Sequence, residues 1–77
     1  MISTVNIVEK TFYLIKFGER LRELRNRSGL TQEQLAEKAK VHRTYIGMIE
    51  RGEKNVTLTN IYKLAKALGI TINEFFV

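Results

Sequence analysis

The chain has 77 residues, enough for one domain, and it contains no cysteine, which excludes disulfides and cysteine-based zinc sites. Thirteen Lys and Arg against eight Asp and Glu give a formal net charge of +5, which favours a polyanionic partner. The lack of cysteine fits a reducing cytoplasm, where we expect the protein, and no apolar run approaches the ~20 residues of a membrane span.

Residues 1–16 are treated as an N-terminal extension. Residues 4–8 and 11–15 are rich in β-branched and aromatic side chains, which favours extended structure. Two strands without a sheet are marginal in water unless they pair across a dimer. The alternative, which we prefer, is that the first helix of the domain begins near Glu9, with residues 1–6 expected to be disordered.

Residues 17–77 are expected to form an all-helical domain of five short helices. The spacing of Phe17, Leu21 and Leu24 predicts the first helix, and Gly29 fits the left-handed residue that follows a helix end. Arginines and glutamates alternate around this helix, so its basic cluster is partly a self-paired, solvated face.

Two further helices are predicted on either side of a tight turn at residues 40–42. Thr31 and Gln34 have the spacing of a capping box, which opens the earlier helix. The later helix is expected from about Arg43 to Arg51. An inward-facing set at helical spacing holds it against the core: Val41, Ile46 and Ile49.

The rest of the chain predicts a fourth helix and a short fifth one. Thr57 is a good N-cap for the fourth. Its apolar stripe would consist of Leu58, Ile61, Leu64, Ala65 and Leu68. Thr71 and Glu74 have the spacing of a second capping box, so we expect the fifth helix to open there.

The C-terminal side chains are more apolar than a small monomer should expose. We expect Phe75 to close the core and Ile72, Phe76 and Val77 to meet a second subunit. The alternative is that all four close the core of the monomer.

Two helices joined by a tight turn are typical of a helix-turn-helix DNA reader, whose second helix enters the major groove. The outward-facing candidates for base contact are Arg43, Thr44, Tyr45, Gly47 and Met48. Arg43 suits bidentate contact to guanine, and Thr44 can hydrogen-bond a base or touch a thymine methyl. Tyr45 could instead pack its ring inward and direct only its hydroxyl to the DNA. The other interpretation is a solvated polar face.

Residues 17–76 resemble the phage-repressor class of helix-turn-helix domains, which includes lambda repressor and Cro and is called the XRE family. The resemblance rests on Leu24-Arg25, Gly29-Leu30-Thr31-Gln32, Leu35-Ala36, Ile46, Ile49-Glu50-Arg51-Gly52 and Leu64-Ala65-Lys66-Ala67-Leu68. Within that class the chain is similar to restriction–modification controller proteins, on Arg43-Thr-Tyr-Ile46 and Asn55-Val-Thr-Leu58.

The resemblance implies roles at matching positions. Gln32 would bond a phosphate and brace the recognition helix, while the DNA backbone would be held by Arg51, Lys54, Asn55 and Thr57. Arg25 would pair with Glu50; alternatively it is one more solvated arginine. The loop residues alone also fit a plain solvated turn. His42 departs from the class, which often has Ser or Asp there, so it would be a substitute cap or a phosphate neighbour.

We therefore expect a homodimeric, sequence-specific regulator that binds double-stranded DNA at a pseudo-palindromic operator, in the manner of a restriction–modification controller. We expect no enzyme, cofactor, metal, small-molecule ligand or membrane partner, because the chain has no aspartate and no nucleotide-binding or nucleophile motif. One alternative is an antitoxin-like protein-interaction module of the same fold. Another is nucleic-acid binding without sequence preference.

Overall fold

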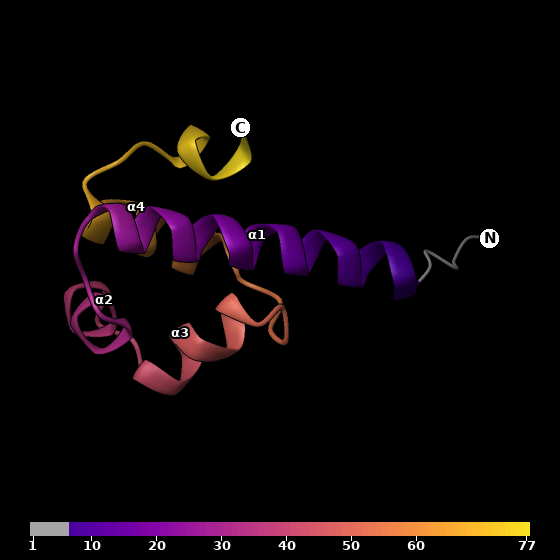
Figure 1. Cartoon of the computed structure of the whole chain (residues 1–77), viewed down its shortest axis with the longest axis horizontal. Coiled ribbons are helices and arrows are strands. Elements are labelled where there is room, and N and C mark those ends of the chain that lie inside the picture. The colour runs from indigo at the N-terminus through magenta and orange to yellow at the C-terminus, as the bar shows by residue number, and fades with distance from the viewer. Residues whose placement is uncertain (1–6) are drawn as a thin grey trace.

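The computed structural model describes residues 7–77, and every regular element in that range is helical (Figure 1). The α-helices are α1 (Ile7–Arg27), α2 (Gln32–Ala39), α3 (Arg43–Glu50) and α4 (Leu58–Leu68), and a 3-10 helix, η1, spans Ile72–Phe76. The predicted all-helical class is confirmed. The predicted count of five is wrong for the described residues, which hold four α-helices and one 3-10 helix.

The last segment differs because its predicted capping box does not form. Thr71 precedes η1, but its side chain makes no cap hydrogen bond. The Glu74 carboxylate lies 3.6 Å from the Arg20 guanidinium, so it interacts with α1 instead of reaching back to Thr71. The turn is closed by the Glu74 N–H donating to the Thr71 carbonyl at 3.0 Å, the three-residue spacing of a 3-10 helix.

Helix α1 begins at Ile7, two residues before the expected start, and the extended alternative for residues 11–15 is wrong. It passes residues 16 and 17 without a break, and the prediction of disorder for residues 1–6 lies outside the described residues. With 21 residues, α1 is about 30 Å long, and its first turns project beyond the other helices (Figure 1). No helix within residues 7–77 combines the length and apolarity needed to cross a bilayer.

The core is formed where α1, α2, α3 and α4 meet. Its largest fully buried side chains are Leu21, Leu35, Ile46, Ile49 and Leu64. Phe75 is also buried, as expected, and its ring lies 5.0 Å from that of Phe17. Leu58 was predicted to join the apolar stripe of α4 but is 65% exposed, since it is the first residue of the helix and lies beyond the core.

A glycine allows α1 to pass directly over the end of α3. A Cβ at Gly18 would overlap the carbonyl oxygen of Ile49 and lie 2.9 Å from that of Glu50. A second close approach follows at Gly52, where φ is +74° and an added Cβ would lie 2.7 Å from Cγ1 of Ile15. The end of α3 is therefore fixed against α1 by backbone contact that larger residues would prevent.

We predict that Gly18→Ala lowers the free energy of unfolding by about 1–3 kcal/mol, because the added methyl group meets backbone that cannot move aside. Alanine is by itself the better helix former, so propensity alone predicts the opposite sign. Urea denaturation measures the change, with Thr11→Ala at an exposed position of α1 as the control. A Gly18→Ala protein as stable as wild type would contradict the close approach.

Candidate nucleic-acid interface

Helices α2 and α3 are joined by a turn that hydrogen bonds hold. The capping box predicted for α2 is present: the Gln34 N–H donates to the Thr31 hydroxyl at 3.0 Å, and the Thr31 N–H donates to Gln34 Oε1 at 2.9 Å. Lys40 then takes a left-handed conformation, with φ of 59°. The next N–H, that of Val41, donates to the Ala36 carbonyl at 3.0 Å, and the half-buried Val41 packs against the core.

His42 precedes α3 and has the extended backbone of a cap residue, with φ of −72° and ψ of 143°. Its imidazole makes no cap hydrogen bond, so the expected role as a substitute cap is wrong. Only its carbonyl contributes, by accepting from the Tyr45 N–H at 3.0 Å. The start of α3, where the helix dipole is positive, is therefore not covered by a side-chain acceptor from its cap residue.

The first turn of α3 presents two exposed side chains, Arg43 and Thr44. Tyr45 and Met48 are half-buried. The Tyr45 ring packs against the core, as one of the two interpretations of the sequence had it, and its hydroxyl accepts from Nδ2 of Asn60 at 2.9 Å. Sequence analysis missed Asn60, because no local pattern links residues of α3 and α4 that meet only after packing.

Gly47 does not face outward as expected. It is buried, and a Cβ there would lie 3.1 Å from Arg51 Nη1 and 3.7 Å from Gln32 Oε1. The missing side chain of Gly47 thus lets the side chains of Arg51 and Gln32 close over the backbone of α3. Its place in the structure is one of spacing between these two side chains.

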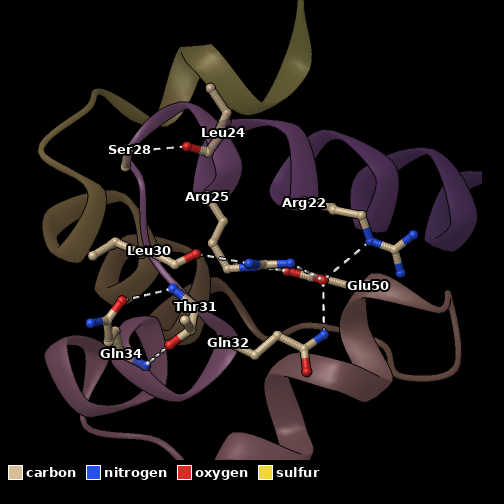
Figure 2. Close-up of polar contacts among 9 residues, drawn as sticks. All are labelled: Arg22, Leu24, Arg25, Ser28, Leu30, Thr31, Gln32, Gln34 and Glu50. Carbon is tan, nitrogen blue, oxygen red and sulfur yellow. Dashed lines mark hydrogen bonds and ion pairs between the residues drawn. The ribbon is translucent and has the colours of Figure 1, made fainter.

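Behind this face, the carboxylate of Glu50 is fully buried and receives donors from α1 and α2 (Figure 2). Arg25 binds it in a bidentate manner, from Nε to Oε2 at 2.6 Å and from Nη2 to Oε1 at 3.0 Å. Gln32 Nε2 donates to Oε1 at 3.0 Å, and Arg22 Nε does so at 3.3 Å. The pair implied for Arg25 and Glu50 is therefore present, and Gln32 and Arg22 complete the set.

Sequence analysis missed Arg22, which it assigned to the solvated face of the first helix. The signal was available, since Arg22 stands three residues before Arg25 and so shares its side of α1. Gln32 was expected to bond a phosphate and to brace α3. Its amide nitrogen is engaged with Glu50, which is the bracing contact.

The electrostatics of Glu50 follow from these contacts. Burial by itself raises the pKa of its carboxyl, but hydrogen bonds from Arg25 and Gln32 and the charge of Arg25 outweigh that effect. The net pKa lies below the usual value for a glutamate. The carboxylate is therefore ionised at neutral pH and fixes the end of α3 to α1 and α2.

The loop after α3 carries the residues expected at the DNA backbone. Lys54 and Asn55 are exposed, and Arg51 is exposed while donating from Nε to Glu53 Oε2 at 2.9 Å. Thr57 accepts the Asn60 N–H at 3.2 Å and so caps α4, as its sequence position predicted. Within residues 7–77 no group of three or more His, Cys, Asp or Glu could hold a metal ion.

A family model described as helix-turn-helix matches residues 21–75. The chain belongs to this XRE-type helix-turn-helix family. Control protein C.BamHI from Bacillus amyloliquefaciens is 51% identical over 55 residues, covering 70% of this chain and 68% of that protein. Control protein C.MunI from Mycoplasma sp is 43% identical over 63 residues, covering 80% of this chain and 85% of that protein.

A solved structure is similar as well. The restriction-modification controller protein C.AhdI from Aeromonas hydrophila has 54% sequence identity and a TM-score of 0.83. The match covers 84% of this chain and 98% of that one, so this chain has residues without a counterpart in C.AhdI. The resemblance to XRE-type domains and to controller proteins is confirmed by these matches.

We predict that Glu50→Gln lowers the free energy of unfolding at pH 7 by about 1.5–3 kcal/mol, because Arg25 loses its charged partner. Since the pKa of Glu50 is lower in the folded chain than in the unfolded one, its ionised form stabilises the fold above the ordinary glutamate range. That stabilisation is lost as the pH falls through the lowered pKa.

Urea denaturation at pH 7 and pH 3 tests this prediction. The wild type should lose more stability on acidification than Glu50→Gln does. Glu53→Gln, which removes the carboxylate of the exposed Arg51 pair, is the control and should cost less than about 1 kcal/mol. Equal losses from both substitutions would show that the buried contact has no special weight.

Proposed function

We propose that the chain is a sequence-specific transcriptional regulator that binds double-stranded DNA as a homodimer at a pseudo-palindromic operator, as a restriction–modification controller. One observation carries the proposal. Helix α3 presents Arg43 and Thr44 to solvent at its first turn, while its other end is held by the buried Glu50. A helix fixed from behind, with free polar side chains at its start, suits a major-groove reader.

Base contact is assigned to Arg43, Thr44, Tyr45 and Met48. Arg43 makes no ion pair within the described residues, so its guanidinium is available to guanine O6 and N7. The Tyr45 hydroxyl accepts from Asn60 and retains its own proton for a base or phosphate. We assign no base contact to the buried Gly47.

Contacts to the DNA backbone are assigned to residues on either side of α3. Gln32 stands at the start of α2, and the loop after α3 supplies Arg51, Lys54, Asn55 and Thr57. Phosphate contacts of this kind fix the register of a reader on the duplex without carrying sequence information themselves. The net charge of +5 favours the same polyanionic partner.

Dimerisation is assigned to the C-terminal end of the chain. Phe76 is 65% exposed and Val77 88% exposed, next to the half-buried Ile72. Apolar surface of this kind on so small a domain marks a subunit contact. Two copies related by a two-fold axis would read half-sites whose centres are about 34–36 Å apart.

Control of restriction–modification genes is proposed from the relatives. C.BamHI and C.MunI are control proteins, and C.AhdI is a restriction-modification controller protein. Each match spans the helix-turn-helix region in which the exposed residues of α3 lie. The proposal requires no catalysis and no cofactor.

The test uses a duplex that the wild-type protein selects, compared with a scrambled duplex at the same salt. We predict that Arg43→Ala loses about 1–3 kcal/mol of binding free energy on the selected duplex and little on the scrambled one. Lys54→Ala is the matched control: it should weaken both alike and lower the salt slope by about one. If Arg43→Ala weakened both duplexes equally, Arg43 would be a phosphate contact and not a base reader.

A further inference from the structure

A groove of about 560 Å³ lies between the projecting half of α1 and the C-terminal end of the chain. Figure 1 shows η1 alongside α1, and the Phe17 ring contacts both Phe75 and Phe76 there. Phe12, Tyr13 and Lys16 line the groove on the α1 side. The C-terminal side is formed by η1 and the residue after it.

The groove is more apolar than the fold requires. Phe12 is 55% exposed and Tyr13 60% exposed, and they lie on the same groove as the exposed Phe76 and Val77. The family model begins at residue 21, so the helix-turn-helix domain is complete without residues 7–16. These turns of α1 therefore carry an apolar face that the domain core does not use.

We propose that a second copy of this chain occupies the groove, with the first halves of the two α1 helices packed antiparallel across a two-fold axis between Phe12 and Tyr13. The inference rests on the homodimer proposed above and extends its interface from the C-terminal end onto α1. The groove joins the two surfaces, so one interface covers both. A symmetric dimer needs a self-complementary surface of this kind.

The spacing of charges on α1 supplies that complementarity. Glu9, Phe12, Tyr13 and Lys16 are separated by three, four and seven positions, so they share one face of the helix. About an axis between Phe12 and Tyr13, each residue meets the one equally far from the axis on the other copy. Phe12 then faces the partner's Tyr13, and Glu9 faces the partner's Lys16.

The contacts within one chain are compatible with this arrangement. Lys16 makes no ion pair within the described residues. The exposed Glu9 carboxylate accepts from the Tyr13 hydroxyl at 3.3 Å, which places an acceptor beside the ring. Glu9 and Lys16 stand about two turns apart, or roughly 10 Å along α1, so they are too distant to pair within one helix.

A charge reversal tests the proposed register in the full chain. Glu9→Lys and Lys16→Glu should each raise the dissociation constant of the dimer about tenfold in sedimentation equilibrium, because two attractive pairs become repulsive. The double variant Glu9→Lys, Lys16→Glu should return to the wild-type value. Because the two residues cannot meet within one chain, recovery reports a contact between copies. A double variant no tighter than the single ones would overturn the register.

A second variant tests the apolar contact. Phe12→Ala should weaken the dimer about thirtyfold, since each dimer loses two half-exposed rings. Tyr62→Ala is the matched control, because Tyr62 is 57% exposed on α4 and does not line the groove. Circular dichroism should show unchanged helix content in both variants. A Phe12→Ala protein that dimerises like wild type would overturn the proposal.

The remaining outcomes separate this inference from the proposed function. If Phe76→Ala alone breaks the dimer, the homodimer stands and the role of α1 is overturned. A wild-type protein that is monomeric overturns both, while binding of Arg43→Ala to DNA still tests base reading independently. A monomer that holds a different protein in stoichiometric amount also overturns the proposal and favours an antitoxin-like module.

Discussion

The buried carboxylate of Glu50 is the contact on which the arrangement of the recognition helix depends. It lies at the end of α3 and receives Arg25 from α1 and Gln32 from α2, so one charge joins three helices. Isolating such a charge from water is costly unless its partners satisfy it, which means that the helices must approach in one geometry. Gly18 allows that approach, because any Cβ there would overlap the backbone at the end of α3.

This arrangement divides the arginines by role. Arg25 is nearly buried and committed to Glu50, whereas Arg43 is exposed and makes no ion pair within residues 7–77. Fold and recognition thus use different residues, so the reading face can be varied at Arg43 or Thr44 without disturbing the buried contact. The glycine at position 47 links the two roles, since its lack of a side chain lets Gln32 brace α3 from one side and Arg51 cover it.

Local signals predicted much of the fold. The capping box of Thr31, the left-handed residue at Gly29 and the core stripe of α3 depend on spacing within a few residues, which the sequence contains. The contact of Arg25 with Glu50 needed the family resemblance, because the two lie 25 residues apart. Contacts set by packing alone were missed, including that of Asn60 with Tyr45 and the covering of Gly47. The last helix became a 3-10 turn because Arg20, distant in sequence, engages Glu74.

The measurement that tests the account most directly is selection of bound duplexes from a random DNA pool by the wild-type protein at physiological salt. The account predicts enrichment of one motif with two-fold symmetry, whose half-site centres are one helical turn, or about 34–36 Å, apart. A pool that stays random while the protein remains folded would contradict it. The exposed face of α3 would then serve a protein partner or binding without sequence preference.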